Sequence, residues 1–183
     1  AEANNIEDLK RLAKENKCIA VMVEIIQGEG GVCPLTEEFV KAVREFTEEN
    51  DMLMIVDEVQ TGNGRSGMLY SYMNYDVMPD IVSTAKGIGG GLPLGATMLG
   101  EKVKDIFTPG SHGSTFGGNP VSTAGAVSII ERIDDKLLAE VREKSNYIFG
   151  ELEHADGVEE VTGMGLMIGI KCKKPAGDVL KTC

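Results

Sequence analysis

The sequence predicts an α/β protein with a mostly parallel sheet flanked by helices. Three apolar runs, bounded by polar or glycine residues, have the length and composition of buried strands: Cys18 to Ile26, Met52 to Val56 and Asp80 to Thr84. A segment with helical periodicity separates the first two runs. Strands that alternate with helices are joined by right-handed crossovers, and such crossovers produce parallel sheets.

Two helices are expected in the first fifty residues. Ile6 to Asn16 carries an apolar stripe at helical spacing, formed by Ile6, Leu9, Leu12 and Ala13. Thr36 is a suitable N-cap for the second helix, because two glutamates follow it and favour the positive end of the helix dipole. That helix ends near Asn50, and its apolar face consists of Phe39, Val40, Val43 and Phe46. Residues 27–35 between the first strand and this helix are predicted as a glycine-rich loop.

The second half of the chain alternates loops, helices and short strands. Leu94 to Leu99 is a short apolar strand, and Phe107 to Pro120 is a loop rich in Gly, Ser and Thr. Two helices should follow, one beginning at Asn119-Pro120 and one over Asp134 to Leu152. The remaining segments are predicted as two strands and the start of a helix, at Val158 to Val161, Leu166 to Cys172 and Gly177 to Cys183.

Composition excludes several classes of function. The chain has 183 residues, 42% of them hydrophobic and 26% charged, as in ordinary globular proteins. Its net charge of −11 argues against nucleic-acid binding. No apolar run approaches the roughly 20 residues of a membrane span, and no signal peptide is expected. The four cysteines (Cys18, Cys33, Cys172 and Cys183) lack CxxC spacing, which favours free thiols in a cytoplasmic protein without metal sites.

An acid and a lysine follow two neighbouring predicted strands. Asp57 ends the run Met52 to Val56, and Lys86 follows the run that ends at Thr84. Ligands of α/β sheets bind at these carboxyl ends. A deprotonated lysine binds an aldehyde covalently, and a carboxylate keeps a pyridine nitrogen protonated. At about 4 Å and an effective dielectric near 20, that ion pair contributes on the order of 4 kcal/mol. We therefore hypothesise that Lys86 forms a Schiff base with pyridoxal phosphate and that Asp57 holds its pyridine nitrogen.

Simpler interpretations exist for each residue alone. An Asp after a strand is often a turn residue or helix cap, and a Lys before glycines is often a solvated loop residue. The glycines from Gly87 to Gly91 do not form a phosphate-binding P-loop, because the order GxxxxGK[ST] is missing. They more naturally let the backbone pass close to a cofactor. The combination of Asp57, Gln60, Lys86 and these glycines favours the cofactor hypothesis.

Several longer motifs resemble the class III pyridoxal-phosphate aminotransferases, and within them the acetylornithine and ornithine enzymes. The similarity covers almost the whole chain. Its motifs are VEIIQGEGG at residues 23–31, DEVQTG at 57–62, GRSG at 64–67, PDI at 79–81, AKG at 85–87, GGGLPLGA at 89–96, HGSTFGGNP at 112–120 and GMGLMIG at 163–169. The chain departs from the family pattern at Ile25, where proline is usual, and at Thr162, where arginine is frequent.

This resemblance implies a fold and a division into domains. The expected fold is the large-domain portion of the PLP-transferase type I (aspartate aminotransferase-like) architecture, followed by the start of a small α+β C-terminal domain. The boundary is placed so that residues 1–156 belong to the large domain and residues 157–183 to the small one. In this fold, Leu94 to Leu99 is the antiparallel member of the sheet. Because family members are longer, we expect the chain to be an internal fragment.

The resemblance also assigns site residues. Lys86 and Asp57 keep the roles given above, Val59 packs on the cofactor ring, and Gln60 bonds the ring hydroxyl. Glu24 lies in the active site and pairs with a substrate-binding arginine. Ser114 and Thr115 lie at a dimer interface, where Thr115 binds the cofactor phosphate of the neighbouring subunit, which implies a homodimer with shared sites. Simpler alternatives are a core role for Val59 and a solvent-facing Glu24.

Two further polar residues, one in the GRSG motif and one in the HGSTFGGNP motif, are interpreted as structural. Arg65 is expected to hold its loop through an ion pair, and His112 to be structural, because Lys86 can serve as the base.

The implied activity is transfer of the terminal amino group of N-acetylornithine, or a related ω-amino acid, to 2-oxoglutarate. Three alternatives stay open: a truncated, catalytically inactive fragment, an ornithine or 4-aminobutyrate aminotransferase, and, more weakly, an aminomutase of the same fold.

Overall fold

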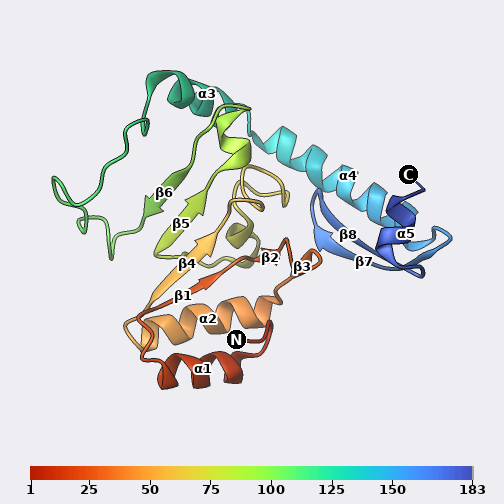
Figure 1. Ribbon diagram of the computed structural model, residues 1–183, viewed down its shortest axis with the longest axis horizontal. Helices are drawn as coiled ribbons and strands as arrows, with labels where there is room; N and C mark the ends of the chain where they lie inside the picture. Colours follow the sequence, from red (N-terminus) through yellow and green to blue (C-terminus); the bar gives the residue numbers. More distant parts are fainter. Residues whose placement is uncertain (183) are drawn as a thin grey trace.

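The computed structural model describes residues 1–182 and has a four-stranded sheet at its centre (Figure 1). Its strands are β1 (Ala20–Val23), β4 (Leu53–Asp57), β5 (Ile81–Thr84) and β6 (Ala96–Leu99), in the order β1-β4-β5-β6. β1, β4 and β5 are parallel, and β6 pairs with β5 in the antiparallel direction. The mostly parallel sheet and the antiparallel strand near Leu99 are therefore confirmed.

The two faces of this sheet differ in how they are covered. Met54 and Val56 of β4 are fully buried and belong to the same core as Val40 and Val43 of helix α2 (Glu37–Glu49). Alternate residues point to opposite faces, and the other face is more open: Met22 is 58% exposed and pairs with Ile55. The main core thus lies between the sheet and α2.

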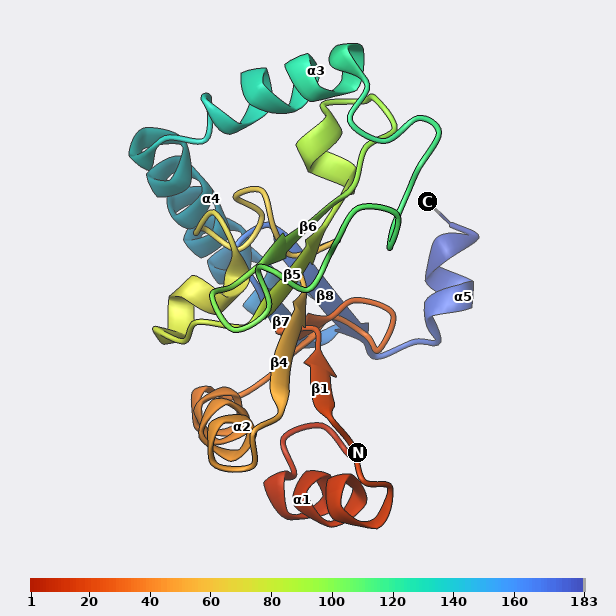
Figure 2. The same cartoon turned by 90° about the vertical axis from the view of Figure 1, so that its left-hand side faces the viewer.

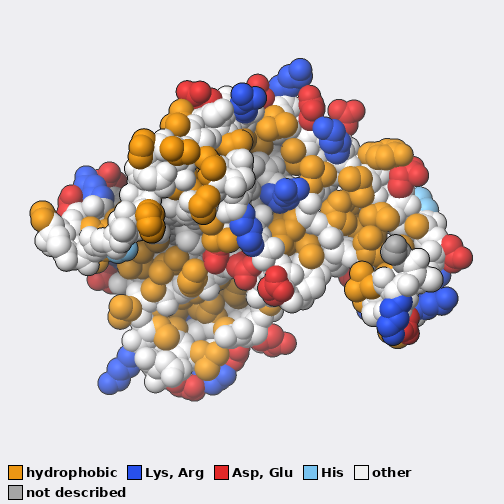
Figure 3. Space-filling view, turned by 45° about the horizontal axis from the view of Figure 1, so that its top comes forward, with side chains coloured by type: hydrophobic (Ala, Val, Ile, Leu, Met, Phe, Trp, Pro, Cys, Tyr) orange, Lys and Arg blue, Asp and Glu red, His pale blue; other side chains and the backbone are white. Residues whose placement is uncertain are grey.

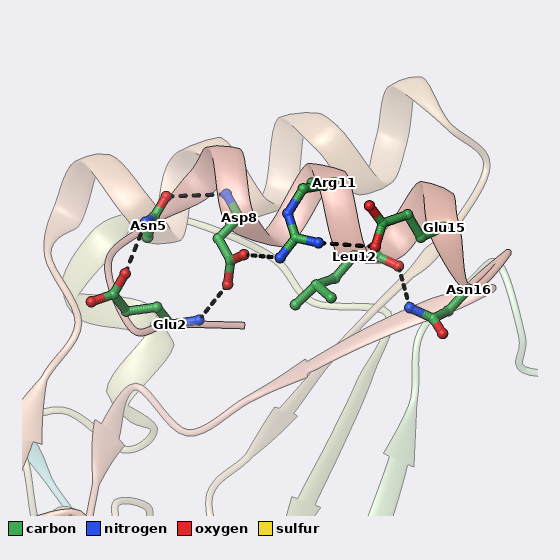
Figure 4. Close-up of polar contacts among 7 residues, drawn as sticks. All are labelled: Glu2, Asn5, Asp8, Arg11, Leu12, Glu15 and Asn16. Carbon is green, nitrogen blue, oxygen red and sulfur yellow. Dashed lines mark hydrogen bonds and ion pairs between the residues drawn. The ribbon is translucent and has the colours of Figure 1, made fainter.

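Helix α1 (Ile6–Glu15) packs on α2, and its ends are closed by asparagines (Figure 4). Asn5 Oδ1 accepts a hydrogen bond from Asp8 N at 3.0 Å, and Asn16 Nδ2 donates to the Leu12 carbonyl at 2.9 Å. Arg11 bridges Asp8 and Glu15 along the exposed surface. In α2, Thr36 Oγ1 accepts from Phe39 N at 3.2 Å, so the predicted cap is confirmed.

The predicted first strand, Cys18 to Ile26, is wrong in its extent. The chain leaves the sheet after Val23 and forms two-residue strands β2 (Ile26–Gln27) and β3 (Cys33–Pro34), which pair with each other in antiparallel fashion. Leu35 N donates to the Ile25 carbonyl at 2.8 Å, which ties this loop back on itself. Ile25 and Ile26 are fully buried without extending β1, so their apolar character could not reveal the break.

The connection from β4 to β5, residues 58–80, contains no α-helix. It consists of turns and one 3₁₀ helix, Ser71–Tyr75. Tyr70, Tyr72 and Tyr75 are buried here, and Tyr75 OH donates to the Leu35 carbonyl at 3.0 Å. Buried aromatic rings therefore fix this connection against the core.

The C-terminal elements follow the predicted order. They are α3 (Pro120–Ile130), α4 (Asp135–Glu153), β7 (Val158–Met164), β8 (Met167–Cys172) and α5 (Ala176–Leu180). β7 and β8 form a separate antiparallel sheet, and α4 packs on β7 (Figure 2). Leu166 N, in the turn of this hairpin, donates to the Arg65 carbonyl at 2.9 Å. The proposed domain boundary at residue 157 stays a prediction.

The structure bears on two expectations for the whole chain, which concern membrane-spanning segments and the state of the cysteines. Within residues 1–182, no helix combines the length and the apolar character needed to cross a bilayer. Cys18, Cys33 and Cys172 are free thiols, and Cys183 lies outside the described residues.

Candidate active site

Three polar residues lie at the carboxyl ends of neighbouring strands. Val23 and Val56 are Cα partners across β1 and β4, so Glu24 and Asp57 follow side by side. Asp57 is in turn the Cα partner of Ser83 on β5. The Ser83 hydroxyl is buried and has no hydrogen-bond partner among residues 1–182. A polar row therefore crosses this edge of the sheet, where ligands of α/β proteins bind.

Asp57 ends β4 and starts a turn. Its Oδ1 accepts a hydrogen bond from Val59 N at 2.9 Å, and Gly62 N donates to the Glu58 carbonyl at 3.0 Å. Val59 therefore does not continue the extended strand, because the Asp57 carboxylate closes a turn instead. One carboxylate oxygen is used in this turn, and Oδ2 has no hydrogen bond within residues 1–182.

Glu58 was not identified from the sequence, although it is fully buried. Its carboxylate accepts from Ser71 Oγ at 2.7 Å, Tyr72 N at 3.1 Å and Thr61 Oγ1 at 2.5 Å. Burial, together with the Glu58 charge, raises the pKa of the Tyr70 and Tyr72 phenols. Buried acids are rare unless they are hydrogen-bonded. Glu58 thus ties residues 59–72 to the end of β4 and supports the turn that carries Val59 and Gln60.

Lys86 has an unusual backbone conformation. Its φ is +50°, in the left-handed region that residues with side chains rarely occupy. It begins a short 3₁₀ helix, Lys86–Gly89, which ends at Gly90, also left-handed. Each such conformation destabilises the folded protein by about 1–3 kcal/mol. Residues in these conformations cluster at functional sites, where contacts with surrounding residues keep them in place.

Lys86 lines a cavity of about 560 Å³, within the range of small-molecule sites. Val59 and Gln60 line the same cavity, so the structure brings three of the predicted site residues together. Asp57 does not form part of its wall. The other lining residues come from the β2–β3 loop, the turn after β4, the 3₁₀ helix that begins at Lys86, α4 and the β7–β8 hairpin: Gly28, Val32, Gly62, Asn63, Gly64, Arg65, Gly87, Leu137, Val141, Leu166, Met167 and Ile168.

Glu24 reaches the rim of this cavity through Gly28. Gly28 N donates to Glu24 Oε2 at 3.3 Å. A Cβ on Gly28 would lie 2.5 Å from Gln60 Nε2, so a larger residue at position 28 would displace the Gln60 amide. The β2–β3 loop and Gln60 are therefore in close contact, and Glu24 holds the loop in that position.

Ser114 and Thr115 lie elsewhere. Both are exposed in the loop that precedes α3, and neither lines the cavity. Ser114 Oγ accepts from Gly117 N at 3.0 Å, which shapes the loop locally. Within one chain, the structure does not bring these two residues to Lys86.

Arg65 differs from its prediction. It is exposed, lines the cavity and forms no ion pair with any of residues 1–182. The loop is held instead through its backbone, because Arg65 N donates to the Gly62 carbonyl and the Arg65 carbonyl accepts from Leu166 N. Backbone hydrogen bonds, and not the expected ion pair, therefore hold this loop.

The residues present fit a pyridoxal phosphate group. The cavity contains one amine, that of Lys86, and the wall includes the Gln60 amide and the apolar Val59. The free oxygen of Asp57 and the buried, unpartnered Ser83 hydroxyl supply polar groups at the adjoining strand ends. Such unsatisfied groups call for a partner in a polar ligand.

Comparisons with known proteins show which family this chain resembles in sequence. Residues 1–182 match the family described as "Aminotransferase class-III". An acetylornithine aminotransferase of Clostridium acetobutylicum is 42% identical over 98% of this chain and 48% of its own length. A [LysW]-aminoadipate semialdehyde/glutamate semialdehyde transaminase of Sulfolobus acidocaldarius is also 42% identical, over 97% of this chain and 47% of its own length.

Solved structures agree as well. The crystal structure of acetylornithine aminotransferase from Elizabethkingia anophelis superposes with a TM-score of 0.89 and 34% identity, covering 100% of this chain and 48% of that one. The chain thus spans about half the length of the relatives it matches. The similarity confirms the PLP-transferase type I fold expected from the sequence. The chain belongs to the class III aminotransferases.

Proposed function

We propose that this chain forms the lysine-bearing part of a transaminase that moves the terminal amino group of N-acetylornithine, or a related ω-amino acid, to 2-oxoglutarate. The observation that carries the proposal is Lys86, held at φ +50° on a cavity that it shares with Val59 and Gln60. An amine on a partly enclosed wall, beside an amide and an apolar side chain, is suited to bind an aldehyde cofactor.

Class III aminotransferases use pyridoxal 5′-phosphate, which when bound withdraws electrons from the substrate carbon next to the amino group. In our proposal the free oxygen of Asp57 accepts the pyridine N–H and keeps it protonated. Val59 covers one face of the ring, and Gln60 Nε2 donates to the ring hydroxyl. Each role uses a group that the chain leaves free or places on the cavity wall.

Lys86 has a second role in this proposal. With substrate bound, Lys86 Nζ would be free to take a proton from the substrate carbon that carries the amino group and to return it at a neighbouring atom. A single base can serve both steps because it stays within reach of both positions. The 3₁₀ helix that starts at Lys86 holds the backbone while the side chain moves.

Glu24 is proposed as a substrate-binding residue, since it follows β1 beside Asp57. Its Oε2 is engaged with Gly28 N at 3.3 Å, and the carboxylate keeps capacity for an arginine partner. The names of similar proteins include acetylornithine, ornithine and aminoadipate semialdehyde enzymes, so the activity test compares several amino donors.

We further propose a homodimer with shared active sites. Helix α3 is mostly apolar and has no distinct polar face, as in helices that become buried. Yet Val121 is 67% and Val127 54% exposed, and Phe116 in the preceding loop is 82% exposed. Figure 3 shows hydrophobic side chains gathered on this face. A second copy that covers α3 would also take up Ser114 and Thr115, whose phosphate-binding role requires a neighbouring subunit.

The dimer is tested by light scattering on the full-length protein and its Val127→Glu variant. A buried charge should dissociate the dimer and reduce cofactor affinity, because the phosphate-binding loop would be lost. Glu131→Gln, at the exposed end of α3, is the matched control and should remain dimeric. A Val127→Glu protein with unchanged mass would contradict this interface.

The remaining parts of the proposal concern domains and location. Residues 1–156 are proposed to belong to the cofactor-binding domain and residues 157–183 to begin a smaller C-terminal domain, since β7 and β8 form their own sheet. A cytoplasmic location is proposed from the free thiols of Cys18, Cys33 and Cys172, which persist in reducing compartments.

The activity is tested with the full-length protein, 2-oxoglutarate and four amino donors: N-acetylornithine, succinyl-ornithine, ornithine and 4-aminobutyrate. Glutamate formation is measured at equal enzyme concentration. The proposal expects the highest kcat/KM with N-acetylornithine. A preference for ornithine or 4-aminobutyrate would identify the alternative aminotransferases, and glutamate formation with none of the four would contradict the proposed function.

A further inference from the structure

Asn63 contacts the segment that carries Lys86, although the two lie in different loops. Its Nδ2 donates to Thr84 Oγ1 at 3.2 Å and to the Ala85 carbonyl at 3.3 Å. Ala85 immediately precedes Lys86, and its carbonyl also accepts from Ile88 N at 3.3 Å. The Asn63 amide therefore joins the end of β5 to the first turn of the 3₁₀ helix.

The orientation of the Asn63 amide follows from its partners. A backbone carbonyl only accepts hydrogen bonds, so the group that faces Ala85 must be the NH₂ group. The amide oxygen Oδ1 is then turned away from this carbonyl. It is buried and has no hydrogen-bond partner among residues 1–182, although Asn63 and Lys86 line the same cavity. The two Nδ2 bonds therefore fix the orientation of the amide toward the Lys86 segment.

Asn63 also packs against the residue after Lys86. A Cβ on Gly87 would lie 3.4 Å from Asn63 Cβ, so the loop passes close to this backbone. Lys86 is in a left-handed conformation that persists only where surrounding contacts fix it. Two hydrogen bonds on one side of Lys86 and this packing on the other supply such contacts.

We propose that Asn63 is a positioning residue for Lys86. Its Nδ2 fixes Thr84 and Ala85 so that Lys86 keeps its left-handed backbone and directs its amine into the cavity. This inference rests on the proposed function for its catalytic consequence. The clamp on the backbone can be measured without any cofactor.

The first test uses hydrogen exchange of the full-length apoprotein. Asn63→Ala should speed the exchange of the Ile88 and Gly90 amides, because the carbonyl of Ala85 loses a donor that orders the turn. Asn74→Ala is the matched control: its Nδ2 also makes two bonds in the same connection, to Ser66 Oγ and the Ser71 carbonyl, but it does not line this cavity. Unchanged exchange in Asn63→Ala, or equal acceleration in Asn74→Ala, would overturn the clamp.

The second test separates positioning from general stability in the loaded enzyme. Asn63→Ala should lower kcat by about tenfold, leave the KM for the amino donor nearly unchanged and reduce the visible circular dichroism of the bound cofactor. Asn74→Ala should alter none of these three. Asn63→Asp keeps the volume and one oxygen but loses the donor, so it should be at least as impaired as Asn63→Ala.

The variants give distinct outcomes. Wild-type kcat and circular dichroism in Asn63→Asp would show that Asn63 only fills space beside Gly87, which would overturn the inference. Wild-type values in Asn63→Ala would overturn it as well. A wild-type protein that forms no glutamate would contradict the proposed function instead, and the hydrogen-exchange result would still decide whether Asn63 holds the Lys86 segment.

Discussion

At the scale of single residues, the site depends on groups of two kinds. The first kind lies at strand ends: Asp57 ends β4, Val59 and Gln60 follow it, and Lys86 follows β5, so the backbone brings all four to one edge of the sheet. Glu58 and Asn63 act through contacts with residues that are 13 to 22 positions away in the chain. No local pattern contains such contacts. Burial and hydrogen-bond partners in the folded chain are needed to identify them.

Lys86→Ala in the full-length protein should abolish covalent retention of the cofactor. It should also lower turnover by several decades, because one amine serves as both the anchor and the proton carrier. Covalent retention is measured by borohydride reduction and mass spectrometry of the peptide that contains residue 86. Lys102→Ala, a lysine that pairs with Asp51 on the surface, is the control and should keep both properties. Near wild-type turnover in Lys86→Ala would contradict the assignment.

Asp57→Asn should leave the fold intact, because the asparagine oxygen can still accept from Val59 N. It removes the charge that keeps the pyridine nitrogen protonated. A charge-assisted hydrogen bond contributes about 1.5–3 kcal/mol, so cofactor affinity should fall by roughly 10- to 150-fold, with a further loss in kcat. Thermal unfolding, cofactor titration and kcat are measured on the same preparation. Weaker cofactor binding with unchanged kcat would reduce Asp57 to an anchor.

At the scale of elements, the prediction was accurate for amphipathic helices and for buried strands with clear boundaries. The caps of α1, α2 and α3 lie at asparagine or threonine residues that satisfy backbone N–H groups locally. The first strand was predicted too long because Ile25 and Ile26 are buried by the β2–β3 loop and not by sheet pairing. An apolar segment indicates that its side chains are buried, but it does not indicate which part of the protein covers them.

Gly165 is predicted to be essential for docking the β7–β8 hairpin onto the loop at residues 64–67. Its φ is +62°, and a Cβ there would lie 2.6 Å from the Ser66 carbonyl carbon and still closer to the Arg65 carbonyl oxygen. Gly165→Ala should therefore destabilise the protein by about 3 kcal/mol, combining backbone strain and steric overlap. Urea unfolding and limited proteolysis of residues 157–174 measure the effect.

Two control substitutions separate the causes of that effect. Gly157→Ala carries a similar strain, at φ +89°, but meets no atom within 4 Å, so it should cost only about 1 kcal/mol. Gly150→Ala, within α4 and also free of neighbours, should stabilise by about 0.5–1 kcal/mol. If Gly165→Ala is no worse than Gly157→Ala, the contact between hairpin and loop does not stabilise the fold.

At the scale of the whole molecule, the chain exposes surfaces that a complete protein would cover. One face of the sheet around Met22 is open, and α3 exposes the apolar side chains of Val121 and Val127. The chain also spans about half the length of its relatives. The sequence alone does not show which surfaces stay uncovered, since that depends on which strand residues face away from α2.

Residues 1–183 expressed alone should therefore self-associate and bind pyridoxal phosphate only weakly. Large exposed apolar patches drive association. Ser114 and Thr115, the groups expected to hold the cofactor phosphate, do not line the Lys86 cavity in the same chain. Phosphate contacts normally provide much of the anchoring for such cofactors, so Lys86 should react slowly, with a dissociation constant well above the micromolar range. Absorbance titration with the cofactor and light scattering at several protein concentrations measure both properties. Micromolar or tighter binding together with glutamate formation would show that these residues form a complete phosphate site by themselves. Arg65, which lines the cavity and forms no ion pair with any of residues 1–182, would then be the first residue to substitute.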